Sequence, residues 1–100
     1  MFKTLEELIA IIRQRKTSPT EESYTNKLLN DKKLNLDKVK EEISELIESV
    51  EQNTNKIHEA ADVIYHLLVT LESASINFDD IIKELKKRED TSGFEEKRNR

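Results

Sequence analysis

Glycine and proline are almost absent from this chain of 100 residues, since each occurs only once, at Gly93 and Pro19. Proteins rich in β-sheet use both residues repeatedly in the turns between strands. Leu, Ile, Glu and Lys, which favour helices, are frequent throughout the chain. A length of this order suits one domain. The sequence therefore predicts a single all-α domain.

Apolar residues recur at helical spacing and divide the chain into segments. The capping-box pattern of Thr4 and Glu7 predicts the start of a first helix, which should end near Lys16 because Ser18 precedes Pro19. A short second helix is expected from a cap at Thr20 to about residue 30, followed by a loop over residues 30–35. Further helices are expected over about residues 37–52, 56–73 and 79–88.

The apolar content is low for a chain that must bury a core. Only 35% of the residues are hydrophobic, and 38% are charged, against about 25% in a typical soluble domain. A small monomer buries a modest fraction of its surface. We therefore expect residues 1–89 to form a bundle of four to five helices completed by dimerisation. Residues 90–100, which are polar, are expected to form a mobile tail.

Charge and composition exclude several classes of protein. The net charge of −4 argues against a nucleic-acid-binding protein, which would usually present a basic face. The absence of cysteine excludes a disulfide framework and a thiolate metal site. Glu6 and Glu7 interrupt the first apolar stretch, unlike a signal peptide, and no apolar run approaches the length of a membrane span. A soluble cytoplasmic protein is expected.

The segment 56–73 carries a strip of polar residues on an otherwise apolar helix. Its members are spaced by three or four residues, so they share one helix face; they are Glu59, Asp62, His66 and Thr70. A buried charge is strongly destabilising unless it is paired or binds a metal. The carboxylates of this strip therefore need a cationic partner.

A second acidic group lies on the expected helix 37–52, at Glu41, Glu42 and Glu45. Glu42 and Glu45 are three residues apart, as Glu59 and Asp62 are, so each pair occupies one helix face. Two antiparallel helices joined by a short loop would bring the two pairs face to face. Four converging carboxylates suit Mg²⁺, which prefers oxygen ligands and accepts substrate phosphates.

Other interpretations of these residues stay open. Runs such as Glu41-Glu42 are usually solvated helix faces, and Glu59 and Asp62 could instead pair with Lys or Arg. His66 alone is more typical of a hydrogen-bonded core histidine than of a ligand. A di-iron bundle is discounted, because it needs a Glu-x-x-His motif on each of two helices and the sequence has none.

A phosphate substrate would also need cations, of which Arg gives bidentate contacts and Lys a point charge. The candidates are Arg13, Arg15, Lys16, Lys27, Lys38, Lys40 and Arg88. Individually, each is more typical of a surface residue with its stem on apolar neighbours. Tyr24 and Tyr65 could stack on a base or fill the core.

The phrase Glu41-Glu42-x-x-Glu45 followed by Glu59-x-x-Asp62 resembles the metal motif of the MazG-like all-α nucleoside triphosphate pyrophosphohydrolases. Further phrases resemble one branch, the phosphoribosyl-ATP pyrophosphohydrolase family. They are Arg15-Lys16, Ser23-Tyr24-Thr25 with Lys27-Leu28, Lys38-Val39, Tyr65-His66, Glu84-Leu85 to Arg88, and the ending from Ser92-Gly93-Phe94 to Lys97. The resemblance covers nearly the whole chain. It departs at Lys40 and Ile43, where family members often have Gly and Ala.

The resemblance implies a helical dimer that hydrolyses phosphoribosyl-ATP to phosphoribosyl-AMP and pyrophosphate, the second step of histidine synthesis. It implies Mg²⁺, with Mn²⁺ able to substitute, at Glu42, Glu45, Glu59 and Asp62. The expected catalytic residues are Glu41, Glu42 and Glu45, with Glu41 or Glu45 as candidate base. The expected substrate-binding residues are Arg15, Lys16, Tyr24, Thr25, Lys27, Lys38, Tyr65, His66 and Arg88.

Two rival functions remain at this point. One is a housekeeping enzyme of the same superfamily that hydrolyses free (d)NTPs, because the metal chemistry would be shared. The other is a non-catalytic helical interaction protein whose carboxylates form salt bridges. The cyclohydrolase that is fused to this activity in some organisms is expected to be a separate protein here.

Overall fold

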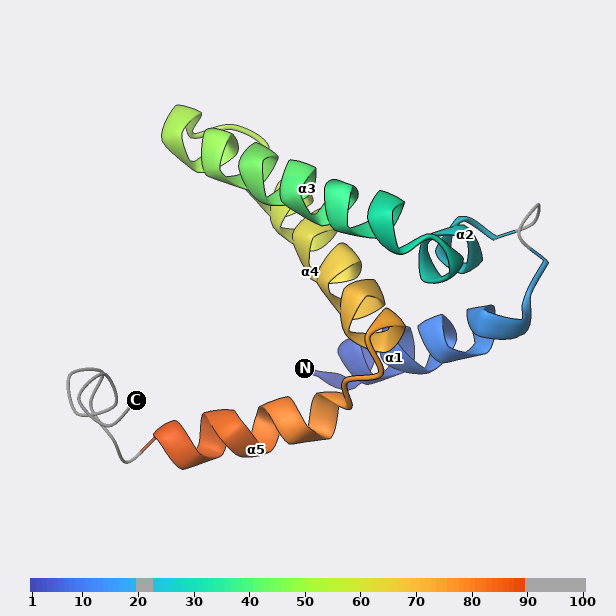
Figure 1. Ribbon diagram of the computed structural model, residues 1–100. Coiled ribbons are helices and arrows are strands. Elements are labelled where there is room, and N and C mark those ends of the chain that lie inside the picture. Colours follow the sequence, from blue (N-terminus) through green and yellow to red (C-terminus); the bar gives the residue numbers. More distant parts are fainter. Residues whose placement is uncertain (20–22, 90–100) are drawn as a thin grey trace.

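The computed structural model describes residues 1–19 and 23–89, and helices are the only regular secondary structure in these residues. The helices are α1 (Lys3–Gln14), α2 (Tyr24–Asn30), α3 (Lys32–Gln52), α4 (Lys56–Ser73) and α5 (Phe78–Arg88), with a short 3₁₀ helix η1 (Arg15–Thr17) after α1 (Figure 1). The all-α prediction is therefore confirmed for the described residues. The expected cap at Thr20 and the expected tail 90–100 lie outside them.

Helices α3 and α4 form an antiparallel hairpin, which is the longest packing contact of the fold (Figure 1). Asn53 and Asn55 connect the two helices with positive φ angles of 57° and 52°. Asparagine tolerates this left-handed conformation better than most residues, because its short polar side chain can bond locally. The break predicted at residues 53–55 is thus observed, and it allows the hairpin to close over three residues.

The buried apolar core is small and centres on the C-terminal half of α4. Its members are Ile12, Leu28, Leu68 and Val69, contributed by α1, α2 and α4. Full burial of one such side chain stabilises a fold by about 1.5–3 kcal/mol. These contacts hold α1 and α2 against α4, which brings the start of α2 beside the polar strip of that helix.

The loop predicted over residues 30–35 is wrong, because α3 already begins at Lys32. The side chain of Asp31 accepts a hydrogen bond from the backbone N–H of Leu34 at 3.0 Å. This bond satisfies one of the free N–H groups of the first turn and caps the helix. The polar residues that suggested a loop thus form the exposed start of a longer helix, although Asn35 itself is buried.

Two other predicted helix starts differ from the structure. The capping box at Thr4 is wrong, because α1 begins at Lys3 after Phe2 and no side chain caps it. Helix α2 is capped by Ser23, whose hydroxyl accepts from the backbone N–H of Asn26 at 3.1 Å. The Ser23 cap fixes the direction in which the first turn of α2 approaches α4.

Both helices of the hairpin expose apolar side chains. On α4, which is apolar outside its polar strip, Ile57, Ile64 and Leu67 are exposed, and on α3 Ile47 and Val50 are exposed. No described helix of this chain covers these positions.

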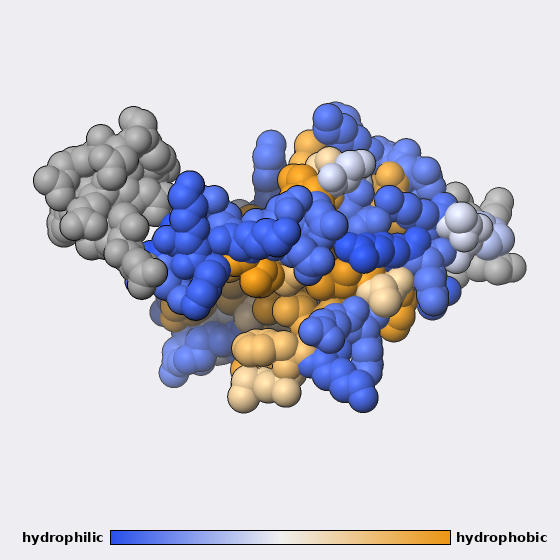
Figure 2. Space-filling view, turned by 90° about the horizontal axis from the view of Figure 1, so that it is seen from below, coloured by the Kyte–Doolittle hydropathy of each residue, from blue (hydrophilic) through white to orange (hydrophobic). Residues whose placement is uncertain are grey.

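A groove between α1 and α5 is also apolar, with Phe2, Leu5, Ile9, Phe78 and Ile82 along it. Figure 2 shows apolar surface at the centre of the face seen from below, between hydrophilic borders. Among the described helices, none combines the length and the apolar character that a membrane crossing would require.

Candidate functional site

The hairpin brings the two predicted pairs of carboxylates together. One carboxylate oxygen from each of Glu42, Glu45 and Glu59 lies within 4.8 Å of the others. Asp62 lies one turn after Glu59 in a second group that also contains His58, again with ligand atoms within 4.8 Å. Because Glu59 belongs to both groups, all four acidic residues lie along one side of the contact between α3 and α4.

The carboxyl groups of this cluster disfavour one another's ionisation. Burial raises the pKa of Glu42, and the charges of Glu45 and Asp62 raise it further, while His66 acts in the opposite direction. Burial likewise raises the pKa of Glu59, with a further contribution from Glu45. Desolvation is the largest cause for both Glu42 and Glu59, and the neighbouring negative charges add to it, because both effects disfavour the ionised carboxylate.

Two buried oxygen atoms of the carboxylate cluster lack partners, which bears on whether the cluster could bind a cation. Glu42 Oε2 and Glu59 Oε2 are shielded from solvent and have no hydrogen-bond partner among the described residues. Within that part of the chain, no ion pair joins Glu42, Glu45 or Glu59 to Lys or Arg, and Asp62 pairs with His58 at 3.3 Å. Among the residues that the structure describes, the Lys or Arg salt bridge considered for Glu59 and Asp62 is therefore not formed. An all-oxygen ligand set with unsatisfied acceptors fits a hard divalent ion.

Glu41 flanks the cluster and is not part of it. Lys38, three residues earlier on α3, donates through Nζ to Glu41 Oε2 at 3.3 Å. The hydrogen bond to Glu41 and the charge of Glu41 raise the pKa of the Lys38 ammonium group, and the charge of Glu42 acts in the same direction. Lys38 and Glu41 thus form a charged pair at the border of the carboxylates.

Four predicted substrate-binding residues meet next to the carboxylates, two from α2 and two from α4. The hydroxyl groups of Thr25 and Tyr65 share a short hydrogen bond between the helices. The His66 ring lies edge-on to Tyr65, with 5.0 Å between centroids, and to Tyr24, with 6.5 Å. Since His66 also acts electrostatically on Glu42, this aromatic cluster borders the acidic one.

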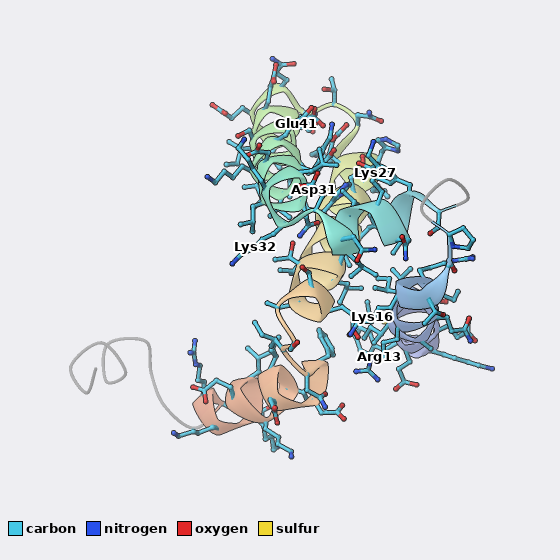
Figure 3. The ribbon with its side chains drawn as sticks, turned by 45° about the vertical axis from the view of Figure 1, so that its right-hand side comes forward. Arg13, Lys16, Lys27, Asp31, Lys32 and Glu41 are labelled. Atoms are coloured by element: carbon cyan, nitrogen blue, oxygen red, sulfur yellow. The ribbon has the colours of Figure 1, made fainter. Side chains whose placement is uncertain are left out.

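Other predicted cations lie elsewhere in a single chain. Lys16 Nζ is 2.8 Å from Glu72 Oε1, where α1 packs on α4, and Figure 3 shows Lys16 and Arg13 together, apart from Glu41. Arg88 Nε is 3.3 Å from Glu84 Oε1 on α5. Lys27 lies on α2, and Arg15 begins η1. The structure does not bring Lys16 or Arg88 to the carboxylates within one chain.

Comparison with known proteins adds independent information. Residues 5–89 match the phosphoribosyl-ATP pyrophosphohydrolase family. The chain is 43% identical to a phosphoribosyl-ATP pyrophosphatase of Methanococcoides burtonii, over 87% of this chain and 93% of that protein. It is 40% identical to one from Caulobacter sp. (strain K31), over 97% of this chain and 92% of that protein.

The chain belongs to the phosphoribosyl-ATP pyrophosphohydrolase family. A chloroplastic histidine biosynthesis bifunctional protein of Arabidopsis thaliana is 37% identical over 97% of this chain. The chain spans only 36% of the length of that bifunctional protein. Family membership gives this chain phosphoribosyl-ATP pyrophosphatase activity.

Two residues near the site of this pyrophosphohydrolase escaped the sequence analysis. His58 lies four residues before Asp62, a helical spacing that could have revealed the contact between them. Asn26 is buried and donates through Nδ2 to the backbone oxygens of Arg15 and Lys16, at 2.7 and 3.0 Å. Nothing in the local sequence distinguishes Asn26 from a surface asparagine, because its partners belong to another helix.

Proposed function

We propose that the carboxylates of the α3–α4 hairpin hold Mg²⁺ and that the family reaction takes place there. The reaction is hydrolysis of phosphoribosyl-ATP to phosphoribosyl-AMP and pyrophosphate, in histidine biosynthesis. The observation that carries the metal proposal is the pair of buried, unpaired oxygens on Glu42 and Glu59. Acceptors that are shielded from water and left unpaired are costly, and a bound divalent ion would relieve this cost.

We assign separate roles in the reaction to the acidic residues of the hairpin. Glu42, Glu45, Glu59 and Asp62 would hold the ion, with Mn²⁺ as a substitute for Mg²⁺. When bound, the ion supplies charge neutralisation for the leaving pyrophosphate and lowers the pKa of coordinated water. The proposed base is Glu41 or Glu45; Glu41 has an exposed carboxylate that accepts a hydrogen bond from Lys38.

The aromatic cluster of Tyr24, Thr25, Tyr65 and His66 would bind the organic part of the substrate. It lies beside the carboxylates and combines ring surfaces with hydroxyl and imidazole groups. Lys27 and Lys38 are proposed phosphate contacts, because both lie on the helices that border the two clusters. Arg15, Lys16 and Arg88 stay candidate contacts for the more distant phosphates.

The proposed assembly is a homodimer formed through the apolar surface of the hairpin. Ile47 and Val50 on α3 and Ile57, Ile64 and Leu67 on α4 are exposed in the single chain. A monomer this small gains stability when a second copy covers such surface. The occupant is a second copy of this chain, since the composition and the small core both leave the monomer poor in buried apolar area.

A substrate panel tests the proposed function. Pyrophosphate release is measured with phosphoribosyl-ATP and with the common (d)NTPs, for the wild-type chain and for Glu42→Gln, Asp62→Asn and Glu51→Gln. We expect release from phosphoribosyl-ATP alone, lost in the first two variants and retained in Glu51→Gln, an exposed site on the same helix. Equal release from (d)NTPs would favour the housekeeping rival, and full activity of both site variants would refute the metal site.

A further inference from the structure

His66 is a buried histidine with one ring nitrogen left without a partner. Its exposed fraction is 7%, and Nε2 has no hydrogen-bond partner among the described residues. The other ring nitrogen, Nδ1, lies 2.9 Å from the backbone oxygen of Asp62. A carbonyl oxygen can only accept, so Nδ1 must carry the hydrogen. In the neutral ring, Nε2 is therefore a bare acceptor.

The orientation of this acceptor is fixed from several sides. The rings of Tyr24 and Tyr65 form T-shaped pairs with the His66 ring, with centroids 6.5 and 5.0 Å from its own. The backbone oxygen of His66 accepts from Thr70 Oγ1 at 2.8 Å, and Thr70 Oγ1 accepts from Asn35 Nδ2 at 2.9 Å. A buried acceptor without a donor destabilises the free protein, and a ligand that supplies the donor relieves this penalty.

We propose that His66 Nε2 accepts a hydrogen bond from a hydroxyl group of the ribose that carries the triphosphate. The inference rests on the proposed function. Ionised phosphate oxygens are acceptors and would repel a bare imidazole nitrogen, whereas a sugar hydroxyl donates. His66 follows Asp62 by four residues, a rise of about 6 Å along α4, which places it next to the carboxylates and among the residues proposed to bind the organic part of the substrate.

The test compares substrates that differ by one hydroxyl. Phosphoribosyl-ATP and its 2′-deoxy and 3′-deoxy counterparts, altered on the triphosphate-bearing ribose, are assayed with the wild-type chain, His66→Phe and His66→Gln. Phe keeps the ring between the two tyrosines, and Gln places an amide oxygen near the position of Nε2. One hydrogen bond corresponds to about a tenfold change in kcat/KM.

We expect the wild-type chain to prefer phosphoribosyl-ATP about tenfold over one of the two deoxy substrates. His66→Phe should lose about this factor on phosphoribosyl-ATP alone and cease to discriminate, while His66→Gln should recover part of the preference. Thermal unfolding of each variant and of Glu51→Gln reports changes in the fold separately.

Two results would overturn the inference. One is an equal kcat/KM of the wild-type chain on all three substrates, a result that does not depend on whether any variant folds. The other is an equal loss on all three substrates in His66→Phe, as a structural role or a contact to water would produce. Either result leaves the proposed function standing if the wild-type chain releases pyrophosphate from phosphoribosyl-ATP, so the two failures are distinguishable.

Discussion

Lys16 Nζ lies 2.8 Å from one carboxylate oxygen of Glu72, and Arg13 Nε lies 3.4 Å from the other. Burial by itself would raise the pKa of Glu72, but the hydrogen bonds and charges of Lys16 and Arg13 outweigh burial and lower it. Arg13 near the end of α1 and Lys16 in η1 are thus both paired with Glu72 on α4. These ion pairs link the end of α1 to the last turns of α4.

Replacing Glu72 by Gln should reduce stability in a way that depends on pH. A carboxyl group with a lowered folded pKa stabilises the fold above its unfolded value, and this contribution is lost as pH falls. We expect Glu72→Gln to lower the free energy of unfolding by about 1 kcal/mol at neutral pH. The difference should shrink below pH 4.5, the ordinary value for Glu. Urea denaturation at several pH values measures it.

Glu84→Gln serves as the control, because Glu84 forms a comparable pair with Arg88 within α5 on the surface. It should change the free energy of unfolding by less than about 0.5 kcal/mol. An identical, pH-independent loss in both variants would contradict a role for the α1–α4 pair.

Replacing Glu42 by Gln should lower activity without lowering the stability of the metal-free protein. The raised pKa of Glu42 means that its stabilising contribution is present at low pH and is lost as pH rises and the group ionises. In the presence of a chelator at neutral pH, Glu42→Gln should therefore unfold at the wild-type temperature or above it. Added Mg²⁺ should raise the unfolding temperature of the wild-type chain more than that of the variant, while kcat/KM falls at least about a hundredfold.

Thermal melts with chelator and with Mg²⁺ measure both effects, and Glu51→Gln is the matched control on the exposed side of α3. If, in the absence of metal, the Glu42→Gln variant is less stable than the wild-type chain, the Glu42 carboxylate already has a stabilising partner within the protein.

The hydroxyl pair of Thr25 and Tyr65 should couple the two helices energetically. A double-mutant cycle with Thr25→Val and Tyr65→Phe is expected to give a coupling energy of about 1 kcal/mol in unfolding, because each variant removes one partner of the bond. Both single variants should also raise KM for phosphoribosyl-ATP. Tyr24→Phe, at an exposed ring, should leave stability within about 0.5 kcal/mol. Strictly additive single effects would exclude the coupling.

A charge on the exposed face of the hairpin should prevent dimerisation. We expect Ile47→Lys or Ile64→Lys to shift the proposed dimer to a monomer in sedimentation velocity, because a lysine buried in an apolar interface is strongly unfavourable. Ile11→Lys, at an exposed position on α1, should leave the dimer intact. A monomeric wild-type chain, or a dimer unaffected by both hairpin variants, would refute the proposed interface.

Sequence reasoning located the elements whose geometry is local. The bounds of α4 and the convergence of the four carboxylates follow from helical spacing and one short turn, so residues 56–73 and the pairs of Glu42 and Glu59 could be predicted. The start of α3 could not, because the Asp31 cap lies in a polar stretch that equally suits a loop. The pairing of Lys16 with Glu72 depends on how helices distant in sequence pack, and helical spacing does not predict such contacts.

The three-residue connection between α3 and α4 also has a consequence for the order of folding. Contacts between segments close in sequence form quickly, because little chain entropy is lost when so short a loop closes. The hairpin can therefore assemble before the other helices dock, and the repulsion among its carboxylates opposes that step. A divalent ion that binds there would accelerate folding as well as serve the finished enzyme.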